Sequence, residues 1–155
     1  MKKQSAGILA YRYNKKQPEC CLVHPGGPFF KNKDLGAWSI PKGEFEEGED
    51  KLVAAKREFK EEMGFAVNGK FIALDPVKLK SGKLVYAWAV EMDFDTSVIS
   101  SNEFEIEWPP RSGRMQSFPE IDRASWFSLE TAMEKINEGQ RGLIIQLKNI
   151  LGTEK

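Results

Sequence analysis

Residues 43–65 read GEFEEGEDKLVAAKREFKEEMGF and carry the strongest local pattern in the chain. Apolar residues recur in this stretch at the spacing of a helix with one buried stripe. The stripe consists of Leu52, Ala55, Phe59 and Met63. Gly64 follows directly, and glycine commonly ends a helix because it adopts the left-handed conformation of the cap without strain. The pattern therefore predicts an amphipathic helix over residues 50–63.

Three glutamates of this predicted helix, Glu58, Glu61 and Glu62, share one face, because residues three and four positions apart are neighbours on a helix. Their like charges repel, and carboxylates near the carboxyl end of a helix also oppose its dipole. Arg57 is the cation that we expect to reach this edge, through Glu61. A hard divalent cation, Mg²⁺ or Mn²⁺, would offset the repulsion, because such ions prefer carboxylate oxygens. A solvated acidic face is the alternative interpretation.

The same segment carries a longer pattern of fixed residues that extends on both sides of the glutamates. The matching residues are Gly43, Glu49, Arg57, Glu58, Phe59, Glu61, Glu62, Gly64 and Phe65. This segment resembles the Nudix box, G-x5-E-x7-R-E-U-x-E-E-x-G-U, in which U is a bulky apolar residue. Residues 38–42 and 120–127, outside the box, resemble the corresponding segments of the family less strongly. The resemblance implies an α/β/α sandwich and a hydrolase that cleaves the pyrophosphate link between a nucleoside diphosphate and a further group.

Position in the motif implies a role for each charged residue of the box. Glu58 and Glu62 are the expected metal ligands, and Glu61 is a further ligand or the base that deprotonates the attacking water. In such boxes Arg57 and Glu49 pair with each other or with neighbouring carboxylates. The expected cofactor is Mg²⁺ or Mn²⁺, since a metal ion on the phosphate oxygens neutralises their charge.

Two groups outside the helix complete the expected metal site. The resemblance implies that the carbonyl of Lys42 contributes to the metal shell and that one more carboxylate approaches from outside the box. We assign the latter role to Glu120, with a surface glutamate as the alternative. Three competitors lie in an apparently irregular stretch, residues 93–117, whose length is typical of a functional loop. They are Glu103, Glu105 and Glu107.

Cations are also expected along the phosphates of the substrate. Arg111 and Arg114 flank a glycine in residues 93–117, and arginine offers phosphate a planar, bidentate pair of donors. Lys42 adds a cation at the entry to the box. An exposed loop without such a role is the alternative for the two arginines.

Aromatic residues and the single histidine have weaker assignments. Phe30 and Tyr86 are candidates for stacking on a nucleobase, whereas we expect Trp88 in the core. His24 is the only histidine of the chain. A zinc or triad chemistry would therefore depend on one residue, and we expect an ordinary loop position or a substrate contact instead.

The remaining pattern predicts an α+β fold with a mixed sheet between helices. Strand-like segments are residues 5–13, 19–24, 69–78, 84–93 and 121–127, and further helices are predicted over residues 128–137 and 141–151. The strands are joined by hairpin-like turns and not by repeated βαβ units. A length of 155 residues without a linker predicts one domain, residues 1–155.

Composition excludes several classes of protein. The 23 basic residues balance the 23 acidic ones, so we do not expect binding to long nucleic acid or to a membrane surface. Apolar runs are too short for a membrane span. The adjacent Cys20 and Cys21 suit neither a disulfide framework nor a zinc site, and we expect two packed thiols. These features, and the lack of a signal peptide, favour a soluble cytoplasmic protein.

We expect the partner to be a small-molecule nucleotide. The best candidate is a dinucleoside polyphosphate, because residues 38–44 resemble the corresponding segment of diadenosine polyphosphate hydrolases. The alternatives are a nucleoside triphosphate, a nucleotide sugar, a capped RNA end, and a non-catalytic module that keeps the fold and binds nucleotides. The oligomeric state has no signature in the sequence.

Overall fold

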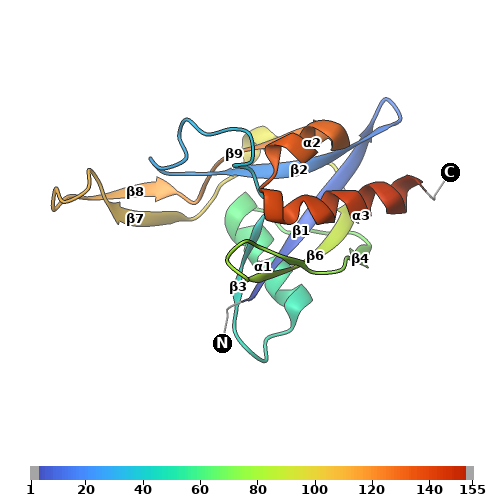
Figure 1. Ribbon diagram of the computed structural model, residues 1–155, viewed down its shortest axis with the longest axis horizontal. Helices are drawn as coiled ribbons and strands as arrows, with labels where there is room; N and C mark the ends of the chain where they lie inside the picture. Colours follow the sequence, from blue (N-terminus) through green and yellow to red (C-terminus); the bar gives the residue numbers. More distant parts are fainter. Residues whose placement is uncertain (1–3, 153–155) are drawn as a thin grey trace.

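The computed structural model describes residues 4–152, which form a mixed sheet flanked by helices (Figure 1). Strand order in the main sheet is β4, β6, β1, β2, β9, with β3 paired to β1 and β5 paired to β6. Their bounds are β1 Gln4–Asn14, β2 Gln17–Pro25, β3 Lys42–Phe45, β4 Phe71–Ala73, β5 Val77–Lys78, β6 Leu84–Glu91 and β9 Ile121–Ser128. The pair of β1 and β6 is parallel, and β1 is antiparallel to β2 and β3.

The helices begin and end close to the predicted residues. They are α1 Lys51–Met63, α2 Leu129–Lys135 and α3 Arg141–Gly152, together with two 3-10 turns, η1 Thr96–Val98 and η2 Glu138–Gln140. At the start of α1, the Asp50 side chain accepts a hydrogen bond from the Val53 N–H at 3.0 Å. At its end, Gly64 has φ of 89°, the left-handed conformation expected of a glycine cap.

Side chains of the central strands alternate between two cores. Leu9 and Cys20 pack toward α2 and α3, whereas their neighbours Ile8 and Cys21 pack toward α1 with Phe59. The sheet therefore lies between α1 on one face and α2 with α3 on the other. This arrangement confirms the predicted α+β class and the α/β/α sandwich.

Both cysteines are the packed thiols that the sequence predicts. Cys20 and Cys21 are free and buried, on opposite faces of β2. Burial raises the pKa of the Cys20 thiol to about 12, and burial also raises the pKa of Cys21. Neither thiol is therefore a ready nucleophile at neutral pH.

The structure corrects three sequence assignments. Residues 93–117 are not irregular, because they contain η1, the strand β7 Glu103–Glu107 and most of its partner, β8 Met115–Pro119. These two strands form a separate antiparallel hairpin that projects from the body (Figure 1). The predicted strand over residues 69–78 is broken into β4 and β5 around Pro76, which has no N–H to donate. Residues 42–45, where the sequence analysis predicts no strand, form β3.

None of the described helices is long and apolar enough to span a membrane.

Candidate active site

Glu62 is the most buried carboxylate of α1, with 6% of its surface exposed. The backbone N–H of Lys42, at the start of β3, donates to its Oε2 at 2.7 Å. Burial raises the pKa of Glu62 to about 8 despite this hydrogen bond, and the charge of Glu58 acts in the same direction. Glu62 therefore ties α1 to β3 and holds its proton more tightly than an exposed glutamate.

Gly43 allows β3 to approach the next carboxylate of the helix. A Cβ atom at this position would lie 2.0 Å from Oε2 of Glu58, so any side chain here would displace the carboxylate. Burial raises the pKa of Glu58, and the negative charge of Glu61 adds to the effect. Glycine is thus required at the first position of the box, because a side chain there would collide with the Glu58 carboxylate.

Arg57 bridges the carboxylates along this edge of α1. Its Nη1 lies 2.8 Å from Oε1 of Glu58 and 3.6 Å from Oε1 of Glu61, and its Nη2 lies 3.2 Å from Oε2 of Glu49. The sequence predicts that Arg57 reaches the acidic edge through Glu61. Its closer contact is with Glu58, because the long guanidinium side chain also reaches the adjacent residue. The acidic edge is therefore partly neutralised.

Glu120 lies directly before β9 and faces the same carboxylates. Burial and the charge of Glu61 raise the pKa of Glu120, and the charge of Glu120 in turn raises the pKa values of Glu58 and Glu62. Its side chain is nevertheless exposed. The structure thus brings an outlying carboxylate to the box, at the residue assigned from the sequence.

The three competitors of Glu120 lie on β7, in the projecting hairpin. Glu103 accepts a hydrogen bond from the Ser117 hydroxyl at 3.0 Å, and Glu107 accepts one from the backbone N–H of Arg111 at 2.9 Å. Glu105 is exposed between them. Glu103 and Glu107 thus take part in the structure of the hairpin itself, whereas the charge of Glu120 acts on Glu58 and Glu62 of α1.

The donor atoms suit a hard divalent cation, although the described residues contain no preformed group of three His, Cys, Asp or Glu side chains that could hold one. Two of the oxygens are engaged elsewhere, since Oε1 of Glu58 faces Arg57 and Oε2 of Glu62 accepts from Lys42. Burial raises the pKa values of Glu58, Glu62 and Glu120, and the charges of neighbouring carboxylates add to each increase. A divalent cation among these carboxylates would offset their repulsion.

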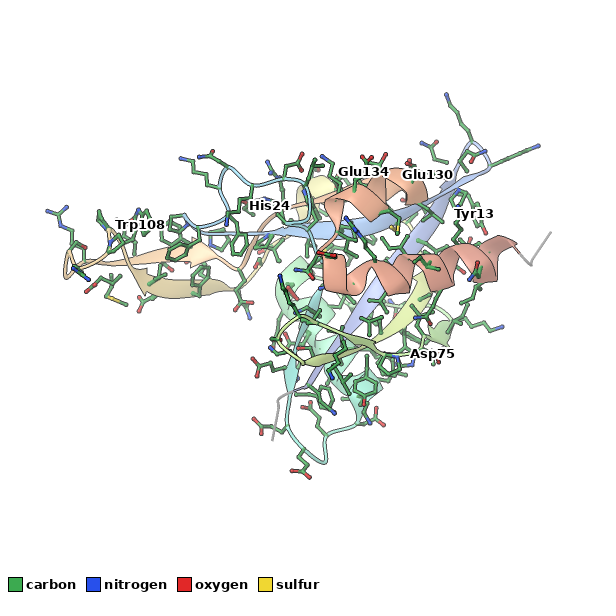
Figure 2. All side chains as sticks on the ribbon, viewed as in Figure 1. Tyr13, His24, Asp75, Trp108, Glu130 and Glu134 are labelled. Atoms are coloured by element: carbon green, nitrogen blue, oxygen red, sulfur yellow. The ribbon has the colours of Figure 1, made fainter. Side chains whose placement is uncertain are left out.

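The residues predicted to bind substrate lie in separate parts of the fold. Arg111 and Arg114 lie in the turn between β7 and β8, at the far end of the projecting hairpin (Figure 1). Nearby, Trp108 packs edge-on against Phe29, with ring centroids 5.5 Å apart (Figure 2). The structure does not bring these two arginines to the carboxylates of α1.

The two aromatic candidates also lie apart from each other. Phe30 is exposed in the segment between β2 and β3, where the Lys33 ammonium lies 5.4 Å from its ring centroid. Tyr86 is on β6, with Phe45 at 6.3 Å and the Lys51 ammonium at 4.8 Å from the ring centre. Trp88 packs against the core on the side of α1, as expected.

An open groove that the sequence analysis missed lies along the turn between β5 and β6. Its volume is about 1170 Å³, and its lining includes Lys78, Lys80, Asn137 and Arg141. Lys83, at the end of the same turn, contacts Glu44 at 3.4 Å. Burial and the charge of Lys83 lower the pKa of Lys42, which places both lysines near the start of the box. No motif indicated the groove, because its residues come from separate segments.

The assignment of His24 to a loop or a substrate contact is wrong. His24 lies in β2 and is fully buried. Its Nδ1 is 2.9 Å from Oδ1 of Asp122, and its Nε2 is 2.7 Å from the carbonyl oxygen of Lys33. Both ring nitrogens are used inside the protein.

This sandwich, with a box helix on one face of a mixed sheet, defines the Nudix class of folds. A family model of the NUDIX domain matches residues 1–147, and the chain belongs to the Nudix family. The expected enzyme class, a Nudix hydrolase, is confirmed at this level. No curated protein matches the chain.

Solved structures of the same fold are similar over nearly the whole chain. The C. elegans Ap4A hydrolase in a binary complex has 22% identity and a TM-score of 0.67, covering 97% of this chain and 99% of that one. The NUDIX domain of Shewanella oneidensis NrtR, complexed with ADP ribose, has 15% identity and a TM-score of 0.66, covering 97% and 89%. The E. coli ORF135 protein has 18% identity and a TM-score of 0.57, covering 98% and 94%.

Proposed function

We propose that this Nudix hydrolase is metal-dependent and that its best substrate is a dinucleoside polyphosphate. The observation that carries the metal dependence is the cluster of Glu58, Glu62 and Glu120: burial raises the pKa of all three, and the charge of Glu120 adds to the increase at Glu58 and Glu62. A group of anions held in this way suits Mg²⁺ or Mn²⁺ bound together with substrate phosphates.

Each residue of the cluster has a proposed role. Glu58, Glu62 and the Lys42 carbonyl hold the cation, and Glu61 either binds it or accepts the proton of the attacking water. Glu120 adds a ligand from outside the box. The cation would neutralise the phosphate oxygens and polarise the phosphorus.

Arg57 and Glu49 act on the geometry of the site. The guanidinium contacts both Glu49 and Glu58, so it restricts the orientation of the Glu58 carboxylate. A ligand that is already oriented loses less freedom when the cation binds, and this favours catalysis.

The preference for a dinucleoside polyphosphate has two supports. One is the resemblance of residues 38–44 to diadenosine polyphosphate hydrolases, in agreement with the fold shared with the C. elegans Ap4A hydrolase. The other is the groove along the turn between β5 and β6, where Lys78, Lys80 and Arg141 offer cations for phosphates remote from the cleaved bond. Arg111 and Arg114 remain a second candidate for these phosphates, and Phe30 and Tyr86 remain candidates for base stacking.

Two other activities compete with this proposal. A nucleoside triphosphate pyrophosphatase would use the same carboxylates on a shorter substrate. A nucleotide-binding module without turnover is disfavoured by the intact set of box glutamates, because binding alone does not require a base. A single domain over residues 1–155 and a location in the cytoplasm remain predictions from the sequence.

The deciding experiment measures product release from a panel of substrates, with Mg²⁺, with Mn²⁺ and with EDTA. The panel contains a diadenosine tetraphosphate, a nucleoside triphosphate and a nucleotide sugar. We expect the tetraphosphate to have the highest kcat/KM and EDTA to abolish turnover. Preference for the nucleotide sugar would contradict the substrate proposal, and full activity in EDTA would contradict the metal.

A further inference from the structure

An irregularity lies at the start of β9, directly after Glu120. Along this strand, Ala124 and Trp126 face the core on the side of α1, so strict alternation would place Ile121 on the opposite side. Ile121 nevertheless belongs to the core on the side of α1. The alternation is therefore broken just after Glu120.

The break is a β-bulge in the pairing of β9 with β2. His24 pairs with Arg123, but the next residue, Pro25, pairs with Ile121. Asp122 is thus an extra residue without a partner on β2. Such bulges re-aim side chains and occur often beside active sites. Here the bulged residue, Asp122, lies two positions after Glu120.

A buried histidine holds the bulged residue. His24 is fully buried at the end of β2 (Figure 2), with Nδ1 at 2.9 Å from Oδ1 of Asp122. Its other nitrogen, Nε2, donates to the carbonyl oxygen of Lys33 at 2.7 Å. The ring therefore connects the bulge to the segment between β2 and β3. Because both nitrogens have partners, the ring is fixed in its orientation.

The backbone on either side of Glu120 is also held. The N–H of Glu120 donates to the carbonyl of Asn102 at 2.8 Å, and its carbonyl accepts from the N–H of Gly26 at 2.9 Å. The N–H of Asn102 in turn donates to the carbonyl of Glu61 at 3.1 Å. Glu120 is thus linked through Asn102 to the carboxyl end of α1, where free carbonyls need partners.

We propose that His24 and Asp122 are positioning residues: by holding the bulge, they direct the Glu120 carboxylate toward the carboxylates of α1. The inference rests on the proposed function, in which Glu120 is a metal ligand. Neither residue contacts the cation or the substrate in this arrangement. Their effect on metal binding passes through Glu120, and it disappears when the Glu120 carboxylate is removed.

A double-mutant cycle tests this dependence. Mn²⁺ binding to the full chain is measured from the EPR signal of free Mn²⁺ for the parent, Asp122→Ala, Glu120→Gln and the double variant. We expect each single change to weaken binding about tenfold, the lower end of the range for groups that orient metal ligands. The double variant should bind no more weakly than Glu120→Gln alone. Additive losses would overturn the inference.

Two further variants distinguish positioning from a merely structural role. Asp122→Asn keeps a side chain of the same shape, whose NH2 can donate to Nδ1 of His24 and whose oxygen can accept from it, so it should bind Mn²⁺ like the parent. Asp93→Ala is the matched control, because this aspartate also loses a 2.9 Å contact, with Arg12, away from the bulge. A loss of thermal stability in Asp122→Ala with unchanged Mn²⁺ binding would overturn the positioning role.

The design also separates this inference from the proposed function. If Asp122→Ala fails to fold, His24→Gln enters the same cycle, since it removes the ring from the other end of the contact. If the parent binds Mn²⁺ and Glu58→Gln weakens that binding, but the cycle is additive, only the positioning role is overturned. If the parent binds no Mn²⁺, the metal site and the inference are both overturned.

Discussion

At the scale of single residues, the site depends on close contacts between β3 and the carboxylates of α1. Gly43 and the Lys42 N–H approach Glu58 and Glu62 from the same strand. The chemistry of these glutamates follows from that approach, because it buries them beside each other and raises their pKa values.

The first prediction concerns Glu58. Glu58→Gln is nearly isosteric but removes a negative charge from the proposed metal site. We expect turnover to fall by roughly 10²–10³ with little change in thermal stability. Glu130→Gln, an exposed residue on α2, is the matched control and should keep the parental rate. Parental turnover in Glu58→Gln would show that the metal site is assigned wrongly.

The second prediction concerns Gly43. Gly43→Ala places a Cβ atom 2.0 Å from the present position of Glu58 Oε2, so the carboxylate must move. Misplacement of a reacting or ligating group by about 1 Å can cost on the order of 10²-fold in rate, and we expect a loss of this size. Gly152→Ala meets no atom within 4 Å and serves as the control. Turnover is measured for both variants. Equal rates for Gly43→Ala and Gly152→Ala would contradict a close contact between residue 43 and Glu58.

The third prediction follows from the pKa of Glu62, which is about 8 in the fold against an ordinary value of 4.5. The folded state therefore holds a proton that the unfolded state releases. This contribution to stability is complete below about pH 4.5 and is lost as the pH rises through 8. Each pH unit in this window costs at most about 1.4 kcal/mol.

Metal-free protein is the sample for this measurement. Urea unfolding between pH 5 and 9, compared with Glu62→Gln, gives the pH dependence that belongs to this residue. We expect the variant to become progressively more stable than the parent as the pH rises. A constant difference between the two proteins would contradict the raised pKa.

At the scale of elements, α1 could be predicted because its stripe, its cap and its charged edge lie in one continuous segment. The projecting hairpin was missed, although β7 alternates Glu with Phe104 and Ile106, which is the pattern of a strand, and the turn after it contains two prolines and a glycine. Its register depends on pairing with β8, which becomes visible only in three dimensions. The role of His24 was missed for a similar reason, because its partner Asp122 is 98 positions away.

The fourth prediction tests which element holds the remote phosphates. We expect Lys78→Ala and Lys80→Ala to raise KM for a tetraphosphate-bridged substrate more than for a diphosphate-bridged one, because contacts to remote phosphates supply binding energy. Arg111→Ala and Arg114→Ala are measured in the same assay. A larger and selective effect of the arginines would instead place the phosphate chain along the hairpin.

At the scale of the whole molecule, the sheet separates two hydrophobic cores, and only one of them lies beneath the candidate active site. The core beneath α1 supports the carboxylates, whereas the core beneath α2 and α3 lies on the other face. The sequence is consistent with this arrangement, because residues 5–13 and 19–24 are continuous apolar runs, as expected for strands that are covered on both faces. It could not predict which loops would meet over the site, since these contacts join segments far apart along the chain.

The fifth prediction separates stability from function. Leu147 is fully buried in the core of α2 and α3, and Leu147→Ala should lower the free energy of unfolding by about 2–5 kcal/mol. Because this core lies across the sheet from α1, we expect Mn²⁺ affinity to remain at the parental value. Urea unfolding and Mn²⁺ titration check the two parts. A parallel loss of affinity would show that the two cores are coupled.

The neighbouring thiols of β2 give each layer its own chemical reporter. Cys20 reacts with an alkylating reagent only when the layer of α2 and α3 opens, and Cys21 only when the layer of α1 opens. Labelling rates of two single-cysteine variants, followed by mass spectrometry, thus measure the local opening of each layer separately. Substrate and metal bound at α1 should slow the labelling of Cys21 more than that of Cys20. The two labelling rates therefore show which face of the sheet a ligand stabilises.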